Sequence, residues 1–561
     1  MKSRLLHLVI ILCLLLFNAN AQDIGTIGSQ KPITVSGSID LRGIGYSVNG
    51  IQARRKPFSY ILSGYTNIAL YGIDIPLSFT VSEQDRNFSQ PFNQYGLSPT
   101  YKWITVHAGY RNISFSPYTL DGHTMLGIGL ELKPKKFQFG IMYGRMNRAT
   151  AVDTTLGTLQ PFGFSRKGLA FKLGIGDERN FFMLSALHAK DDSSSVSVVD
   201  PLTKQMVRAA ANTVGSVAWR TQFLKKFFIE ADGGASFWTN DVGSTLVIAD
   251  SSGWVDKIRK FMPINGTTEF STAYRAAAGF TGKFWGLKFE YKHIDPQFRS
   301  MGVYYFNNDI ESYTVSPSFI LFKNRFRLNG SIGKQKDNTK KQKESTTTRT
   351  IGMANLSWDI TQRFGVDASF INYSSNSKPT VVLIQNKYLL AQNNNNISFT
   401  PRYVFANERS SHVVIASYNR SILTDDNAAT QTSNNITTDI ILLNYTYTIV
   451  KRALSITAGV NRAVNKLSTG DFENMSYTLA LNKSWFKNKL VGALNNTYTN
   501  SKGATGSTGI YNLMANGSYQ PTTHHRFSVR YSLLNNRPDN AANPQVQFAE
   551  NTCEAAYTYS F

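Results

Sequence analysis

Apolar and polar residues alternate along most of the sequence with a period of two, and this pattern constrains the fold more than any other feature. Segments 137–144, 287–292, 326–332, 443–449 and 527–533 each place aromatic or branched residues on one side and mostly polar or small residues on the other. Successive side chains of an extended chain point to opposite faces, so the pattern predicts two-faced β-strands. Apolar residues at helical spacing are hard to find, and we therefore expect very little helix.

The end of the chain shows the same alternation. In Cys553–Phe561 (CEAAYTYSF) one side carries Tyr557, Tyr559 and Phe561, and the other carries Glu554, Thr558 and Ser560. Soluble domains usually end in a polar tail. We interpret these residues as a membrane strand, with the last strand of a soluble all-β domain as the alternative.

The start of the chain predicts export. Lys2 and Arg4 precede an apolar stretch at 5–17, and Ala19-Asn20-Ala21 matches a cleavage site, so residues 1–21 are predicted to be a secretory signal peptide. One cysteine, Cys553, would remain in the mature chain, which excludes an internal disulfide.

After residue 21 no apolar run approaches the roughly 18 to 20 residues of a transmembrane helix. A membrane-embedded form of this chain must therefore be a closed barrel, because a barrel pairs every backbone polar group. The chain has 59 Lys and Arg against 36 Asp and Glu. These cations are scattered, without a nucleic-acid-reading module, so we expect an electropositive surface or lumen and no nucleic acid.

Short polar or basic connectors recur between the predicted strands. They occur at residues 73–76, 97–102, 133–136, 177–180, 224–226, 282–286, 323–325, 361–363, 407–411, 450–452, 486–489 and 521–525. Longer polar segments separate them, such as 239–268, 334–350, 374–396 and 423–437. Short turns on one side and long loops on the other are typical of bacterial barrels, and twelve short turns imply about 26 strands, within a range of about 22 to 30.

The signal peptide, alternating strands, short basic turns and aromatic end resemble Gram-negative outer-membrane β-barrel proteins. The resemblance implies a single all-β, transmembrane, antiparallel up-and-down barrel over residues 33–561, with short periplasmic turns and long extracellular loops. It also implies contact with outer-membrane lipid and lipopolysaccharide, and assembly by the barrel-assembly machinery, with Tyr557, Tyr559 and Phe561 as the assembly signal. Residues 22–32 would be a short periplasmic segment, too short for the plug domain of TonB-dependent transporters.

Polar residues on the predicted inner faces of the strands are candidates for the lining of the lumen. Charges of both signs can pair across the wall or set an ion preference, and they can equally be hydrated wall residues. The candidates are Lys172, Arg220, Glu230, Lys288, Glu290, Lys292, Arg327 and Arg530.

Segment 103–192 combines compact loops with glycine, aromatic and arginine residues. The stretch 110–123 is too apolar to be merely solvated, so it either folds inward and narrows the channel or packs on a partner. Nearby cations make it a candidate constriction or anion-attracting patch. The alternative is a packing cluster whose arginines pair with aspartates. The patch comprises Arg111, Tyr118, Arg145, Arg148, Arg166 and Lys167.

We predict no enzyme, cofactor or metal site. The histidines lack metal-ligand spacing with neighbouring carboxylates, except the adjacent pair His524 and His525 in a predicted turn. No Ser and His pair stands out as a nucleophile and base.

A wall of about 26 strands leaves a wide opening, because barrels of 16 to 18 strands already enclose a channel. We expect inward-folded loops, chiefly 239–268 with Trp254, or a separate plug protein to fill it. The sequence therefore predicts a channel, or the membrane component of a transport or secretion complex. The alternative is a non-transporting scaffold whose extracellular loops bind or anchor another surface protein.

Overall fold

The computed structural model of the chain describes residues 32–71, 73–83, 94–150, 163–196, 208–247, 262–343, 345–379, 390–425, 427, 431–539 and 546–561. The predicted signal peptide and all of the segment 22–32 except its last residue lie outside the described residues.

The described chain consists almost entirely of β-strands. Their bounds are β1 Ile33–Asn49, β2 Phe58–Leu70, β3 Ile73–Ser82, β4 Gln94–Leu97, β5 Thr100–Tyr101, β6 Ile104–Asn112, β7 Leu120–Asp121, β8 Thr124–Leu132, β9 Phe137–Asn147, β10 Ser165–Gly176, β11 Phe181–Asp192, β12 Ala211–Phe223, β13 Phe227–Thr239, β14 Thr268–Thr281, β15 Trp285–Ile294, β16 Gly302–Val303, β17 Ile310–Leu321, β18 Phe326–Lys336, β19 Ser345–Asp359, β20 Phe364–Pro379, β21 Leu390–Ala406, β22 Ser410–Asp425, β23 Ile436–Ile449, β24 Leu454–Lys466, β25 Phe472–Trp485, β26 Leu490–Gly503, β27 Gly506–Tyr519, β28 His525–Pro538 and β29 Phe548–Ser560. A short α-helix, α5 (Gln431–Asn434), and a 3₁₀ turn, η3 (Val450–Arg452), accompany them. None of the described helices is long and apolar enough to cross a membrane.

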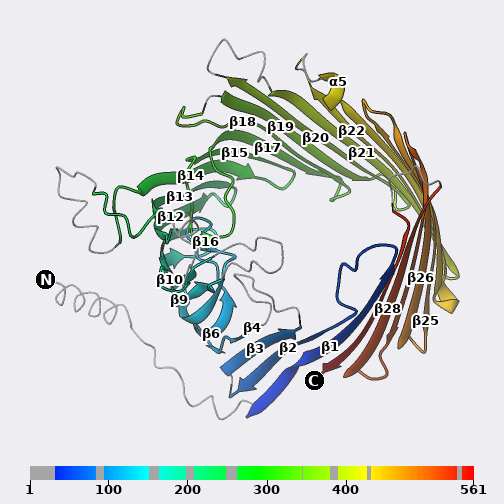
Figure 1. The fold of residues 1–561 in the computed structure, drawn as a ribbon, viewed down its shortest axis with the longest axis horizontal. Helices are drawn as coiled ribbons and strands as arrows, with labels where there is room; N and C mark the ends of the chain where they lie inside the picture. Colours follow the sequence, from blue (N-terminus) through cyan, green and yellow to red (C-terminus); the bar gives the residue numbers. More distant parts are fainter. Residues whose placement is uncertain are drawn as a thin grey trace.

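One sheet of 27 strands forms a closed wall, in which each strand pairs antiparallel with its neighbours (Figure 1). β4 and β5 both lie between β3 and β6 and occupy one position of the wall, so 27 minus one gives a 26-strand barrel. β1 pairs with β29 from Ser38–Ser560 to Asn49–Ala549 and closes the ring. This confirms the predicted fold class and strand number, and the architecture is that of an outer-membrane β-barrel.

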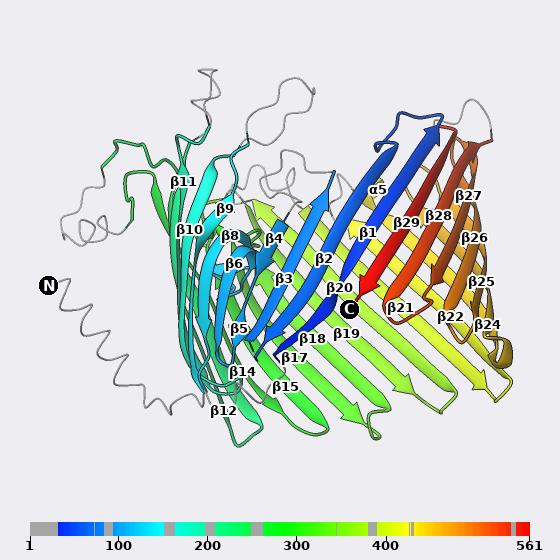
Figure 2. The ribbon, with the colours of Figure 1, turned by 90° about the horizontal axis from the view of Figure 1, so that it is seen from below.

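Short and long connections lie at opposite rims of the wall (Figure 2). The twelve short turns contain the described residues 71, 102–103, 133–136, 177–180, 224–226, 282–284, 322–325, 360–363, 407–409, 450–453, 486–489 and 520–524. Eleven of them lie where the connectors predict. The first prediction, 73–76, is wrong, because these residues begin β3. Proline has no backbone N–H to donate to a strand ladder, but Pro76 is tolerated in β3 because it lies beside the break between β4 and β5. Its carbonyl accepts a hydrogen bond from the Ser98 backbone N–H.

Several strands extend further into the polar segments than the sequence predicts. β18 to β23 extend into 334–350, 374–396 and 423–437, which were expected to be loops. Side-chain bonds between neighbouring strands explain this difference: Asn372 Nδ2 lies 2.8 Å from Asn393 Oδ1 and 2.6 Å from Asn395 Oδ1. Amide ladders of this kind stabilise paired strands without an apolar face.

The outer face of the wall is apolar. Ile39 and Leu41 of β1 lie opposite Tyr559 and Tyr557 of β29, and all of these side chains point outward. An apolar outer face meets the requirement of a barrel whose outside contacts lipid. The buried apolar residues have a different position, since most of them lie on the inner side of the wall between β6 and β17.

Candidate functional site

Two connections fold into the barrel and cover one part of its inner wall. They are residues 113–123, between β6 and β8, and residues 295–306, between β15 and β17; we call them the loop pair. β7 and β16 join them in a parallel two-stranded sheet, with Gly302 opposite Leu120 and Val303 opposite Asp121. Figure 1 shows β16 inside the ring, against the wall of β9 to β14. Of the two predicted roles of 110–123, the structure therefore has the inward fold.

The loop pair is held first by apolar packing. Leu120, Phe115 and Met301 are buried in one cluster with wall residues such as Met142 and Leu187. A second cluster joins Tyr118 and Phe298 to Val214, Ala273 and Ile294. Burial of this extent stabilises each large side chain by about 1.5–3 kcal/mol, so the pair is a packed layer and not a hydrated loop.

Glycines make room for this layer. A Cβ at Gly140 would lie 2.8 Å from the Phe115 ring, and a Cβ at Gly234 would lie 2.8 Å from Tyr118 Cβ. A Cβ at Gly302 would lie 2.2 Å from the Thr119 backbone oxygen, a contact that real structures do not show. The small residues of the wall are thus matched to the large residues of the loop pair.

Several buried polar groups of the loop pair and the wall form hydrogen bonds with one another. The Ser216 hydroxyl bonds Ser116 Oγ at 2.9 Å, and the Met301 backbone N–H donates to Asn212 Oδ1 at 3.0 Å. Within the pair, Ser300 Oγ donates to the Thr119 carbonyl at 2.6 Å. Paired buried polar groups make the docking geometry specific.

Tyr118 links the loop pair to a charge network on the inner wall. Its hydroxyl donates to Asp232 Oδ2 at 2.7 Å. Arg275 joins the three carboxylates of this network, with Nη2 2.6 Å from Asp232 Oδ1 and Nη1 3.2 Å from Glu230 Oε1 and 3.4 Å from Glu290 Oε2. Burial and the Asp232 carboxylate raise the pKa of the Tyr118 hydroxyl, which therefore stays a donor.

The network brings together several of the predicted lumen residues. Lys288 Nζ lies 2.6 Å from Glu290 Oε2, and Arg220 Nη1 lies 3.6 Å from Glu230 Oε2. Lys292 lies opposite Arg275 in register. Arg275 at the centre was missed, although Ser271, Ala273, Arg275 and Ala277 follow the same alternation.

A second charge cluster lies under the other end of the loop. Glu131 has Lys172 Nζ at 3.4 Å, Lys133 Nζ at 3.4 Å and His107 Nε2 at 3.5 Å. The Phe115 ring lies over Lys172, with Nζ 5.2 Å from the ring centroid. Aromatic residues of the loop thus rest on both charge clusters.

The structure distributes the residues of the predicted patch over both faces of the wall. Arg111 bridges the broken strand, and its guanidinium donates to the carbonyls of Leu97 and Pro76 and to Ser78 Oγ. Arg166 forms a two-bond pair with Asp191, at 2.7 Å and 3.2 Å. Arg145 and Lys167 are opposite one another in register and lie on the outward face with Tyr143 and Leu169. Arg148 follows the end of β9.

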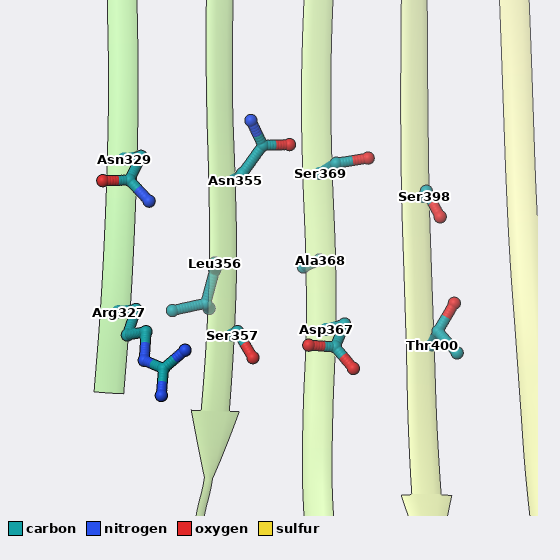
Figure 3. A pocket seen from close by; sticks show the side chains of 10 residues that line it. All are labelled: Arg327, Asn329, Asn355, Leu356, Ser357, Asp367, Ala368, Ser369, Ser398 and Thr400. Atoms are coloured by element: carbon teal, nitrogen blue, oxygen red, sulfur yellow. The ribbon is translucent and has the colours of Figure 1, made fainter. Parts of the chain in front are cut away.

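Arg327 and Arg530 lie on other parts of the inner wall. Arg327 of β18 borders a shallow concavity of about 390 Å³ that extends past β19 to Asp367 of β20 and Thr400 of β21 (Figure 3). Arg530 is opposite Glu554 in register, and its Nη2 lies 3.5 Å from Met514 Sδ.

The wall opposite the loop pair is lined by hydroxyl and amide groups. Hydroxyl pairs join neighbouring strands at Thr400 and Ser417 (2.9 Å), Thr446 and Thr457 (2.9 Å), and Thr478 and Thr497 (3.0 Å). Charged residues on this wall form separate pairs, such as Arg402 with Asp359 and Asp367, and not one network like that beneath the loop pair. Among the described residues no group of three or more His, Cys, Asp or Glu side chains is placed to hold a metal ion.

The described ends of segment 239–268 do not belong to the loop pair. Asn265 Nδ2 donates to the Asp241 carbonyl at 2.8 Å, so the two ends of this connection are tied to each other. Trp254 lies outside the described residues. Residues 295–306 form the second inward segment and were not predicted to do so, although Phe298, Met301 and Phe306 repeat the apolar composition of 113–123.

Comparisons with known proteins find solved structures of low similarity to this chain. No family model and no curated protein matches the sequence. Among solved structures, the copper transporter OprC matches with a TM-score of 0.41 and 9% identity, covering 94% of this chain and 80% of that chain. BauA, the ferric preacinetobactin receptor of Acinetobacter baumannii, matches with 0.38 and 8%, covering 94% and 81%. The translocation pore of the P pilus usher PapC matches with 0.34 and 10%, covering 94% and 99%.

Proposed function

We propose that this barrel is the membrane component of a transport or secretion complex and that a partner polypeptide occupies its lumen. The observation that carries the proposal is the contrast between the size of the wall and what lines it. Twenty-six strands about 4.8 Å apart and tilted by about 40° give a circumference of about 160 Å, and so a width of about 50 Å between opposite backbones in a round barrel.

Among the described residues, the loop pair covers only one side of this opening. The loop pair covers the inner wall near β8 to β14, whereas the inner faces of β18 to β29 carry hydroxyl and amide groups. An opening of this width would pass folded proteins and abolish the barrier of the outer membrane. A partner on the polar wall removes this problem, and hydrated hydroxyl and amide groups suit a polypeptide that is inserted and released.

The test uses single cysteines on the two faces of the polar wall, in a Cys553→Ser background. Ser398→Cys and Thr478→Cys lie on the inner face, and Ile397→Cys and Leu479→Cys are their outward neighbours. Membrane-impermeant maleimides of graded size are applied to intact cells and to protein purified in stringent detergent. We expect the inner cysteines to be protected in cells and to react with the large reagent after purification.

Two outcomes contradict the proposal. If the inner cysteines react with large reagents in intact cells, the lumen is open and the barrel is a plain channel. If they stay unreactive after purification, the chain fills its own lumen, which favours a non-transporting scaffold. If the proposal is correct, mass spectrometry of gently purified barrel identifies a partner polypeptide that is present in the same molar amount as the barrel.

A further inference from the structure

The rim formed by the short turns is strongly and unevenly basic. The twelve turns defined above contain sixteen Lys and Arg and three acidic residues, Asp177, Glu178 and Glu408. The other sequence segments between consecutive wall strands, which are much longer, contain fifteen Lys and Arg and fifteen acidic residues. We call the cations of the twelve short turns the basic collar.

Most of the collar charge is not neutralised within the protein. All sixteen cations belong to the described residues. Two of them form ion pairs with carboxylates, Lys133 with Glu131 and Lys136 with Asp177. Arg325 and Lys489 instead donate to backbone carbonyls. The collar therefore presents a positive field to whatever lies beside this rim.

An aromatic belt places the collar at the depth of lipid phosphates. On the outer face near the short turns, Phe223, Phe227, Phe280 and Trp285 contact one another with ring centroids 4.5–5.6 Å apart. Phe326 and Trp358 continue the belt at 6.0 Å. Aromatic belts mark the boundary between acyl chains and head groups, so the turns just beyond the belt meet the head groups.

Three turns hold an apolar residue and a lysine in a backbone conformation that favours glycine or asparagine. Leu224 and Lys225 have φ of 52° and 56°, Phe322 and Lys323 have 52° and 56°, and Phe486 and Lys487 have 51° and 53°. Hairpin turns with two positive φ values are usually built from Asn and Gly, because this conformation costs other residues conformational free energy. The apolar members are 78%, 68% and 70% exposed, and Phe322 has one edge contact with the Phe326 ring, so packing within the protein covers little of their surface.

We infer that the basic collar is a binding surface for anionic phospholipid head groups of the periplasmic leaflet. Each strained pair supplies the two parts of such a contact, an apolar side chain for the acyl region and an ammonium group for a phosphate. Lys283 lies over the Phe284 ring at 5.4 Å and Lys102 over the Tyr101 ring at 5.3 Å, so cations and aromatic rings share one layer. Basic clusters beside membrane segments recognise anionic head groups in this way. An acidic protein would be attracted by the charge but would leave the apolar side chains without a lipid.

The experiment reconstitutes the purified barrel in vesicles of phosphatidylethanolamine with a minor fraction of phosphatidylglycerol, without lipopolysaccharide. The lipid retained by the protein is measured by native mass spectrometry. We expect phosphatidylglycerol to be enriched about tenfold over its bulk fraction. The collar variant carries Gln at Lys225, Lys226, Lys323, Lys451, Lys487 and Lys489 and should lose this enrichment.

A matched control removes the same number of charges from the opposite rim, with Gln at Arg54, Arg55, Lys56, Lys340, Lys341 and Lys343. It should keep the enrichment. Equal retention of both lipids by the unmodified barrel, or an equal loss in both variants, would overturn the inference. Tighter binding of an acidic protein than of the anionic vesicles would also overturn it. Folding of each variant is checked by its heat-dependent gel mobility. The phosphatidylglycerol enrichment of the unmodified barrel tests the inference even if a variant does not fold.

Discussion

At the scale of single residues, Tyr118 is the most specific link between the loop pair and the wall. Its hydroxyl donates to a carboxylate at 2.7 Å in a buried site, and hydrogen bonds to charged groups contribute about 1.5–3 kcal/mol. We expect Tyr118→Phe to weaken docking of residues 113–123 by about this amount, measured as faster hydrogen exchange of their amides. Tyr531→Phe removes an equivalent hydroxyl, 2.8 Å from Asn551 Oδ1, far from the loop, and should leave that exchange unchanged. Equal exchange in Tyr118→Phe and the parent would contradict the role of this bond.

His123 should make the loop pair sensitive to acid. It is buried, its ring stacks on Tyr304 with centroids 4.4 Å apart, and burial lowers its pKa to about 4. The ordinary pKa is about 6.5, so protons bind the released state first and docking weakens as the pH falls from 6.5 through 4. A fluorinated tyrosine at position 304, observed by fluorine NMR, should report this transition. The variant His123→Gln carries no charge change and should show no transition; an identical transition in both proteins would show that another group titrates.

At the scale of elements, the parallel pair of β7 and β16 depends on Gly302. A side chain there meets the Thr119 carbonyl and the Leu120 Cα, which are backbone atoms that cannot turn aside. We expect Gly302→Val to separate the two strands at a cost of about 1–3 kcal/mol or more and to raise hydrogen exchange in both inward segments, with the barrel still folded. Gly517 has no atom within 4 Å of an added Cβ, so Gly517→Val is the matched control. Protection of both segments in Gly302→Val would show that β7 and β16 do not hold them together.

These elements also show how far the sequence determines the fold. The alternation predicts the strands, and the basic turns predict their number, because both patterns are local. The polar ends of β20 and β21 are not predicted, since Asn372, Asn393 and Asn395 satisfy one another only after the strands have paired. The pairing of Leu120 with Gly302 joins residues 182 positions apart, so no local pattern reveals it. The apolar composition of 113–123 indicated burial but did not identify the partner.

At the scale of the whole molecule, the two rims and the two inner walls differ in chemistry. One inner wall carries a charge network covered by the loop pair, and the other carries mainly hydroxyl and amide groups with separate ion pairs. One rim is nearly neutral, and the other is basic and bordered by aromatic rings. The proposed lumen partner and the proposed lipid contact therefore use separate surfaces, so loss of either contact should leave the other intact.

Closure of the barrel depends on the seam between β1 and β29. The backbone N–H of Phe561 donates to the Gly37 carbonyl at 3.0 Å, and the Gly37 N–H donates to the Phe561 carbonyl at 2.9 Å. The Phe561 ring lies 5.7 Å from that of Tyr559, which contributes to the outward aromatic belt with Tyr557 and Phe527. These contacts agree with the proposed role of Tyr557, Tyr559 and Phe561 in assembly, because the seam forms only when the two ends of the wall meet.

We expect Phe561→Glu to reduce the amount of folded barrel in the outer membrane several-fold, since a carboxylate beside the belt opposes insertion at the last step of closure. The folded fraction is measured by heat-dependent gel mobility of membrane fractions. Phe561→Trp keeps an aromatic ring at the interface and should assemble normally, whereas Asp539→Asn, in a long connection, tests an unrelated change of charge. If Phe561→Glu reaches the membrane in the same amount as the other two variants, backbone pairing between β1 and β29 is sufficient for closure. The terminal ring then has no part in assembly.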